Sequence, residues 1–157
     1  YLPADDAGAT SNMLIQALLK SPTQSLDLFP SGEAKLEVMT SHTLTNKDGK
    51  TKVYLYALKG LGFNPDFSWY DQDGNFFAKN LDGFMRIIRE GFTLEQFDEL
   101  TTIQSQAEEK NLLAVAKKLS NPYQRLLIQN VDWVDVVEGK KHKKMDILLE
   151  NGFIKKY

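Results

Sequence analysis

The chain has 157 residues and a mass of 17.8 kDa, the size of one ordinary domain or of two small ones. Its 42% hydrophobic and 25% charged residues exclude wholesale disorder, collagen and coiled coils. A formal net charge of -2 gives no general attraction to nucleic acid, and no apolar run approaches the roughly 20 residues of a membrane span. The absence of cysteine from the sequence excludes disulfides, thiolate metal sites and a thiol nucleophile.

The first predicted element is a short helix. Ser11 is placed to cap a helix over residues 12–20, which ends before Pro22 because the residue preceding a proline avoids the helical conformation. The residues expected on its buried face are Leu14, Ala17 and Leu18. Residues 1–8 are expected to form a lead-in, and residues 26–29 a short extended segment.

Two long alternating runs follow, over residues 33–44 and 51–58, and a glycine-containing turn joins them into a predicted hairpin. The residues expected on one face of the first run are Ala34, Leu36, Val38 and Leu44. Two shorter runs, residues 66–70 and 76–79, flank a second turn at 71–75. The pattern predicts an antiparallel, twisted sheet of at least four strands.

The hydrophobic period then changes. Residues 84–91 indicate a short helical or mixed stretch, and Thr93 with Gln96 fits a capping box at the start of a long helix. The predicted helical stripe consists of Phe97, Leu100, Ile103, Ala107, Leu113 and Ala116. The helix runs through Lys118, with room for an interruption near residues 108–111.

The sequence predicts two parts, residues 1–121 and residues 122–157. The first is an α+β domain in which the helices pack on one face of the antiparallel sheet. The second is a β-hairpin of strands over 126–135 and 145–150, followed by a tight Asn151-Gly152 turn. Two or three short strands without a covering helix do not make a stable domain alone, so we expect the hairpin to belong to an incomplete structure.

The last segment resembles the opening strands of metal-dependent amidohydrolases, namely the imidazolonepropionase-like and dihydroorotase-like enzymes. The shared pattern is an apolar strand, a Gly-Lys turn at residues 139–140, and Asp-Ile-Leu-Leu-Glu-Asn-Gly-Phe-Ile at residues 146–154. Residues 33–91 also resemble an N-terminal extension of bacterial, exported members of that family. The phrases that carry this second resemblance are Gly-Leu-Gly-Phe-Asn-Pro at 60–65, Trp69, Asp-Gly-Asn-Phe-Phe-Ala at 73–78, and Glu-Gly at 90–91.

This resemblance implies that the chain is a non-catalytic, accessory N-terminal region of a hydrolase that acts on carbon–nitrogen bonds. Residues 122–157 would be the first strands of a small β-sandwich, and the partner would be the catalytic barrel of the same polypeptide. The family binds one or two divalent metal ions, such as zinc, and its first His-x-His would follow Ile154, beyond Tyr157. The resemblance therefore implies no catalytic, cofactor-binding or metal-ligating residue in this chain, and no activity of the chain by itself.

The resemblance and the start of the sequence also suggest a location and partners. The chain begins at Tyr1 without a methionine, so we expect a trimmed or mature product, and a periplasmic or extracellular location in a bacterium. A homo-oligomer is left open, whereas nucleic-acid binding and a membrane span are not expected. The second reading of function is an envelope carrier-like binding module, with a hydrophobic ligand held between a helix and the sheet.

Two short polar motifs invite a functional reading. Residues 71–75 are similar to the start of a calcium loop, but the sixth position is Phe76 and the twelfth is Asp82, so a plain hairpin turn is favoured. Residues 140–144 are the only basic run, and a solvated hairpin tip is favoured over a phosphate-binding patch because the overall charge is acidic.

Other candidate groups also have structural explanations. The dense aromatic residues are expected mainly in the core, with a ligand groove or a docking face as the alternative; they are Phe63, Phe67, Trp69, Tyr70, Phe76 and Phe77. His42 is predicted to share a face with Leu36 and Val38 and to be a satisfied structural histidine, far in sequence from His142. The helical carboxylates are expected on a solvated face and do not form a glycosidase pair; they are Glu95, Asp98, Glu99, Glu108 and Glu109.

Overall fold

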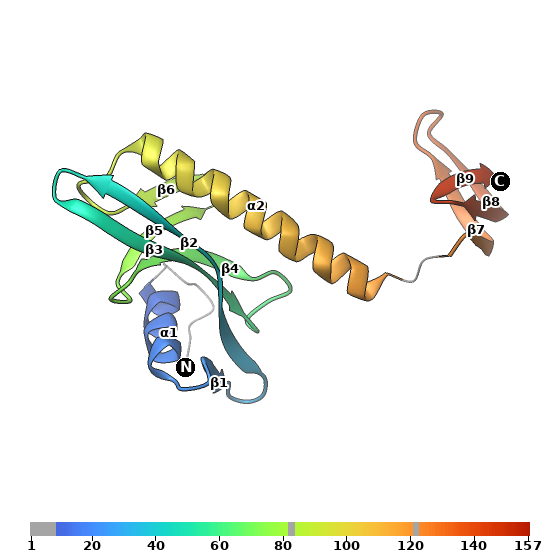
Figure 1. Cartoon of the computed structure of the whole chain (residues 1–157). Coiled ribbons are helices and arrows are strands. Elements are labelled where there is room, and N and C mark those ends of the chain that lie inside the picture. The colour runs from blue at the N-terminus through green and yellow to red at the C-terminus, as the bar shows by residue number, and fades with distance from the viewer. Residues whose placement is uncertain (1–8, 82–83, 121–122) are drawn as a thin grey trace. The chain divides into compact units, whose positions relative to one another are not determined.

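The computed structural model describes residues 9–81, 84–120 and 123–157, and the chain divides into two compact units, Tyr1–Leu112 and Leu113–Tyr157. The two helices are α1 (Ala9–Lys20) and α2 (Leu94–Leu119), and the division falls inside α2. Each unit contains an antiparallel sheet (Figure 1). The predicted α+β class with antiparallel sheets is therefore confirmed. No described helix combines the length and the apolarity needed to cross a membrane.

The sheet of the first unit has six strands, and each strand pairs with its neighbour in chain order. They are β1 (Ser25–Asp27), β2 (Glu33–Asn46), β3 (Gly49–Lys59), β4 (Asp66–Asp71), β5 (Phe76–Leu81) and β6 (Met85–Ile88). The two predicted hairpins are confirmed as β2–β3 and β4–β5. The helical reading of residues 84–91 is wrong, because β6 pairs with the edge of β5 through Ala78 and Ile88. So short a run of apolar residues on both sides of Arg86 fits either the helical or the strand period, and the free edge of β5 decides between them.

The two helices cover opposite faces of this sheet, with α1 on one side and α2 on the other (Figure 1). Successive residues of a strand point to opposite faces. Leu55 of β3 therefore packs in one core cluster with Phe97 and Leu100 of α2. Tyr56, the next residue, packs in a second cluster with Ile15 of α1. The expectation that the helices share one face does not hold, because both faces of the sheet carry large apolar side chains that need cover.

A β-bulge in β2 explains how one strand serves both clusters. The register with β3 shifts between Val38 and Thr40, so one extra residue, Met39, lies in β2. Leu36, before the bulge, belongs to the cluster of α1, whereas Leu44, after it, belongs to the cluster of α2. The sequence prediction that placed Leu36 and Leu44 on one face is therefore wrong. A bulge adds one residue and so reverses the inward and outward positions beyond it.

Helix α1 begins earlier than predicted, at Ala9. Ser11 consequently lies inside the helix and is buried, so it is not the residue before the first helical turn. The fully buried side chains are Ile15 and Leu18, and Ala17 is exposed. A start three residues upstream leaves the helical spacing of the apolar residues intact, and Ile15 and Leu18, three positions apart, form the buried face.

Helix α2 begins with the predicted capping box. The Thr93 hydroxyl accepts a hydrogen bond from the Gln96 amide at 3.3 Å, and the Gln96 side-chain oxygen accepts one from the Thr93 amide at 3.0 Å. The helix continues without a break through residues 108–111 to Leu119. Its buried residues are Phe97, Leu100 and Gln104, and the half-buried Ile103 and Ala107 pack against the same core cluster, so contact with the sheet reaches Ala107.

The second unit contains a three-stranded sheet of β7 (Arg125–Asp135), β8 (Lys140–Glu150) and β9 (Phe153–Lys156). Every described side chain of this unit is exposed or half-buried. The register pairs Leu126 with Leu149 and Ile128 with Ile147, and Leu149 also pairs with Ile154. These five aliphatic residues lie on one face, which we call the open apolar face. The predicted hairpin is present, with a third strand beside it.

Candidate functional site

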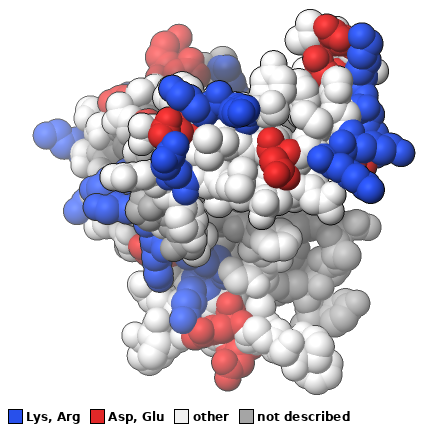
Figure 2. All heavy atoms as spheres, turned by 90° about the vertical axis from the view of Figure 1, so that its right-hand side faces the viewer, with Lys and Arg blue, Asp and Glu red and all other residues white. Residues whose placement is uncertain are grey.

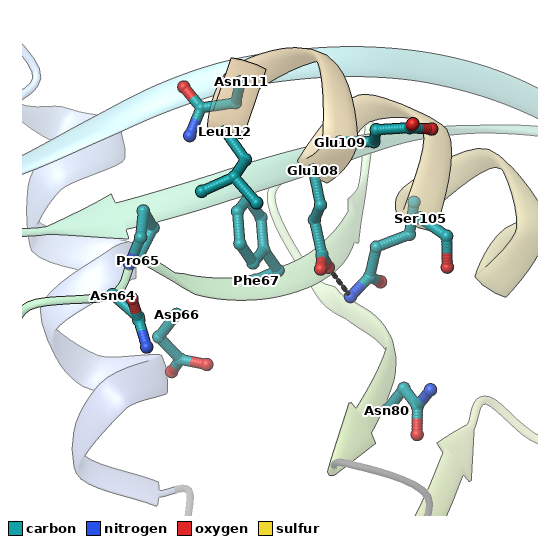
Figure 3. Close-up of a pocket in the computed structure, with 11 residues that line it drawn as sticks. Asn64, Pro65, Asp66, Phe67, Asn80, Ser105, Glu108, Glu109, Asn111 and Leu112 are labelled. Carbon is teal, nitrogen blue, oxygen red and sulfur yellow. Dashed lines mark hydrogen bonds between the residues drawn. The ribbon is translucent and has the colours of Figure 1, made fainter. Parts of the chain in front are cut away.

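A pocket of about 580 Å³ lies within the first unit, where the middle of α2 passes over the beginning of β4 (Figure 3). Its floor is formed by the loop before β4 and by the first residues of that strand, and the other wall is formed by α2. The lining residues are Asn64, Pro65, Asp66, Phe67, Asn80, Gln104, Ser105, Glu108, Glu109, Asn111 and Leu112. The pocket joins residues that are about forty positions apart in sequence, which is why no local motif revealed it.

The helix wall of the pocket continues the face of α2 that packs on the sheet. Phe97, Leu100 and Gln104 are buried along this face, and Glu108 and Asn111 follow at the same helical spacing. Polar residues thus follow Leu100 along this line of the helix, while Ile103 and Ala107 beside them still pack against the core cluster. A cavity remains at this place because the side chains of Gln104, Glu108 and Asn111 do not fill the space above β4.

A chain of two hydrogen bonds leads from the core to this pocket. The indole N–H of Trp69, a fully buried residue, donates to Gln104 Oε1 at 3.1 Å. Gln104 Nε2 donates in turn to Glu108 Oε1 at 2.7 Å, as the dashed line in Figure 3 marks. Since the indole can only donate, it fixes which end of the Gln104 amide faces the pocket. The Glu108 carboxylate is therefore held by a donor whose orientation the core determines.

The pocket is electronegative. Its lining includes Asp66, Glu108 and Glu109 but no lysine or arginine. Lys79, outside the lining, has its Nζ 2.7 Å from Asp66 Oδ2, and its side chain is 13% exposed. This ion pair offsets one of the negative charges. No ion pair joins Glu108 or Glu109 to another residue within the part of the chain that the structure describes.

Residues 71–75 form the turn between β4 and β5, as the sequence favoured. Asp71 Oδ1 accepts hydrogen bonds from the amides of Asp73 and Asn75 at 2.9 and 2.8 Å, and Asp71 Oδ2 accepts one from Arg89 at 2.8 Å. Burial alone would raise the pKa of Asp71, but the hydrogen bonds from Asn75 and Arg89 outweigh it and lower the pKa. The carboxylate that a calcium loop would need is thus engaged in holding the turn.

The basic run at residues 140–144 begins β8 and is not a hairpin tip as predicted. Two of its lysines form ion pairs, Lys140 with Glu138 at 2.9 Å and Lys141 with Asp132 at 2.8 Å. On the face of the molecule drawn in Figure 2, blue side chains lie next to red ones, and uncharged residues cover most of the surface. The neighbouring acids weaken the attraction that this run would exert on a polyanion.

The aromatic residues are divided between the two cores and the surface. Trp69 and Phe77 are fully buried on the side of α2, and Tyr70 on the side of α1, where its ring meets Phe76 edge-on at 5.8 Å. Burial raises the pKa of Tyr70 well above its usual range. Phe63, in the loop beside the pocket, is fully exposed. Core packing therefore explains most of these rings, as expected, but not Phe63.

His42 contacts a residue that sequence spacing did not suggest. Because of the bulge at Met39, His42 is paired with Val53 and lies on the face toward α2, so the predicted face with Leu36 is wrong. Its Nε2 is 2.7 Å from Glu99 Oε1. Asp98 pairs with Arg86 at 3.1 Å. The carboxylates of α2 are thus exposed as predicted except for Glu108, which is half-buried and lines the pocket.

Residues 9–81, 84–120 and 123–157 bring together no group of three or more histidine and carboxylate side chains that could hold a metal ion. Two features remain as candidates for function, namely the pocket over β4 and the open apolar face. Comparison with known proteins gives no further guide: no family model, no curated protein and no solved structure matches this chain.

Proposed function

We propose that this chain is a non-catalytic accessory region of a larger hydrolase, and that the Leu113–Tyr157 unit is the part that joins it to the hydrolase body. The body would be a metal-dependent amidohydrolase that cleaves carbon–nitrogen bonds with one or two divalent ions, such as zinc. The chain would contribute packing surface to that enzyme and no residue to its chemistry. A periplasmic or extracellular bacterial location belongs to the same proposal.

The observation that carries the proposal is the open apolar face. Leu126 is 39% exposed and Ile154 is 61% exposed, although both lie in paired strands. A three-stranded sheet becomes stable in water when one of its faces is covered, and contiguous exposed apolar residues mark surfaces that are covered in the working assembly. The strands of this unit therefore have the character of one layer whose second layer is supplied by other residues.

The nature of the covering body is supported by the resemblance of residues 126–154 to the first strands of amidohydrolases. The order of features fits that resemblance, because β7 and β8 are joined through Gly139, which has a φ of 66°, and Asn151 and Gly152 form the turn into β9. The apolar strand, the Gly-Lys connection and the second strand of the pattern thus correspond to β7, the turn after it and β8 in a three-stranded β-meander.

The first test is the gene itself. A segment with His-x-His within about thirty residues after Tyr157 would support the proposal, because alternation along a strand puts both imidazoles on one side, as a metal requires. A stop codon directly after Tyr157 would contradict the proposal if no neighbouring gene encodes a protein with that His-x-His segment. The isolated chain with added zinc should show no hydrolysis of amide or cyclic imide substrates, and measured turnover would also count against the proposal.

A pair of variants of the full-length gene product tests the docking surface. Ile128→Lys places a charge on the open apolar face, whereas Leu127→Lys places the same charge on the opposite face of β7. We expect Ile128→Lys to lower the thermal midpoint of the whole enzyme and its soluble yield much more than Leu127→Lys. Equal effects would show that the open apolar face is not the covered one.

The alternative, a carrier-like module for a hydrophobic ligand, is less well supported. Apart from the pocket over β4, the two core clusters occupy the space between each helix and the six-stranded sheet. The pocket over β4 is lined by carboxylates and amides as well as by Phe67 and Leu112. A lipid-like ligand would leave those polar groups without hydrogen-bond partners.

A further inference from the structure

We infer that the pocket over β4 binds a small organic cation, an alkylammonium compound, with the Glu108 carboxylate as its counter-ion. All residues of this pocket lie within Tyr1–Leu112. The inference is therefore independent of the proposed docking of the second unit, and either could fail without the other.

The first argument is the placement of polar residues where a structural role would favour apolar ones. Gln104, Glu108 and Asn111 occupy the side of α2 that faces the sheet, in line with Phe97 and Leu100. Leucine is similar in size to these side chains, and at these positions it would bury apolar instead of polar surface next to the core cluster. A hollow lined with hydrogen-bonding groups at this place is explained by a ligand that uses them.

The second argument is the fixed position of the Glu108 carboxylate. Its Oε1 accepts the hydrogen bond from Gln104, whose amide is itself held by the buried Trp69 indole. A charged group that is already oriented loses little conformational entropy when it meets its ligand. The Glu108 side chain extends from α2 and lines the pocket, and its carboxylate has acceptor sites beyond the one that Gln104 uses (Figure 3). They are available to a donor such as an ammonium group.

The third argument is charge. After Lys79 has offset Asp66, the carboxylates of Glu108 and Glu109 leave the pocket negative, and no basic side chain lines it. In a concave site the surrounding low-dielectric walls strengthen such a field, which favours cations and repels anions. A phosphate or carboxylate ligand is disfavoured for the same reason.

The fourth argument is the apolar part of the wall, which distinguishes an organic cation from a metal ion. The ring of Phe67 and the side chains of Leu112 and Pro65 lie on the same pocket (Figure 3). A volume of about 580 Å³ falls in the ordinary range of small-molecule sites. An alkyl chain would lie against Leu112 and Pro65, and the aromatic face attracts an ammonium group at close range.

The test is calorimetric titration of the full chain with 1,5-diaminopentane, with 1-pentanol as the neutral probe of similar length. We expect saturable binding of the diamine and none of the alcohol at equal concentration. Calcium chloride tests for an inorganic site and should not displace the diamine at matched ionic strength. N-acetyl-lysine N-methylamide carries the same ammonium on a peptide unit, and the tighter of the two amines identifies a free amine or a lysine side chain as the source of the cation.

Two matched variants assign the binding to Glu108. Glu108→Gln keeps an oxygen to accept the Gln104 hydrogen bond but removes the charge, and we expect it to weaken diamine binding by at least about tenfold. Glu90→Gln removes the same charge from an exposed acid outside the pocket and should leave the affinity within about twofold. Near-ultraviolet circular dichroism confirms that both variants are folded.

The inference is overturned by any of four results. These are no binding of the diamine to the natural chain, equal binding of 1-pentanol, displacement of the diamine by calcium, and equal affinity of the Glu108→Gln and Glu90→Gln variants.

Discussion

Both units of this chain contain an antiparallel sheet in which strands that follow each other in sequence are paired, but only the first unit covers its sheet with helices. In Tyr1–Leu112 the sheet lies between two helices, and side chains such as Leu55 and Trp69 are excluded from water. In Leu113–Tyr157 strands β7 and β8 have 11 residues each, the same length as β3, yet none of the described side chains of this unit is buried. Strand pairing alone thus does not give a core; a second layer is needed.

The difference teaches where function should be sought. The first unit has what it needs to fold by itself, so its polar pocket is a feature beyond folding. The second unit has apolar residues that it does not cover, so its surface indicates a partner. Matched substitutions in the two units test this difference. Native-state hydrogen exchange of the β3 and β8 amides gives the opening free energy of each unit separately.

The largest effect is expected from truncation of a buried residue. Leu55→Ala should lower the opening free energy of β3 by about 3–5 kcal/mol, because Leu55 is fully buried and its removal leaves a cavity. Leu127→Ala, on a half-exposed residue of β7, should change that of β8 by less than about 1 kcal/mol. Similar losses at the two positions would mean that the second unit has a cover of its own.

A second contrast concerns glycines in the left-handed region. Gly60 has a φ of 97°, and a Cβ there would collide with the carbonyl oxygen of Glu33, so Gly60→Ala should cost about 3 kcal/mol. Gly152 has a φ of 82° but open space around it, so Gly152→Ala should cost only about 1 kcal/mol of backbone strain. Comparable losses would show that φ alone, and not the close approach of β2, sets the cost at Gly60.

The third contrast compares two aspartates that hold turns. Asp71→Ala should cost about 2 kcal/mol at neutral pH, because it removes two amide contacts and leaves Arg89 without its carboxylate. Asp135 accepts the amides of Val137 and Glu138 in the same way but on the surface, and Asp135→Ala should cost less than about 1 kcal/mol.

The stabilisation by Asp71 should depend on pH. The pKa of Asp71 is lowered in the folded chain, so its stabilising effect is complete above the unfolded pKa of about 3.9 and is lost as the pH falls through the folded pKa. The difference between the natural chain and Asp71→Ala should therefore shrink below about pH 4. Urea unfolding at pH 7 and pH 3 measures it, and a constant difference would contradict the assignment.

The smallest effect is expected for ion pairs. Lys79→Met removes a mostly buried ammonium from Asp66 and should cost about 1 kcal/mol. Lys141→Met breaks the exposed pair with Asp132 and should cost less than about 0.5 kcal/mol. The second cost should vanish in 1 M salt while most of the first remains, and the reverse order would contradict the burial of Lys79.

Local features of the fold were predictable from the sequence because local chemistry determines them. The β2–β3 hairpin follows from alternation and a glycine turn, and the start of α2 follows from the Thr93 and Gln96 pair. Features that depend on distant residues were not predictable. Strand β6 forms because β5 offers an edge, and the helices divide between two faces because both faces of β3 are apolar.

The candidate site was missed for a related reason. Glu108 and Glu109 looked like a solvated face, since nothing in the helix sequence shows that β4 begins beneath them. One signal was present: Gln104 and Glu108 continue the spacing of Phe97 and Leu100, so polar residues stood at positions that a core would fill. His42 was assigned to the wrong face because an extra residue in a strand leaves no mark in composition.

The bulge at Met39 has a consequence for how this sequence can change over time. Because it sets the phase of the strand between the two cores, loss of a single residue between Leu36 and Thr43 that lies before His42 would turn His42 and Leu44 together from the face of α2 to the face of α1. Substitutions in β2 can accumulate one at a time, but a length change there is tolerated only with a compensating one nearby. Sequences that evolve from this chain should therefore differ in the residue types of β2 but keep the same number of residues in that strand.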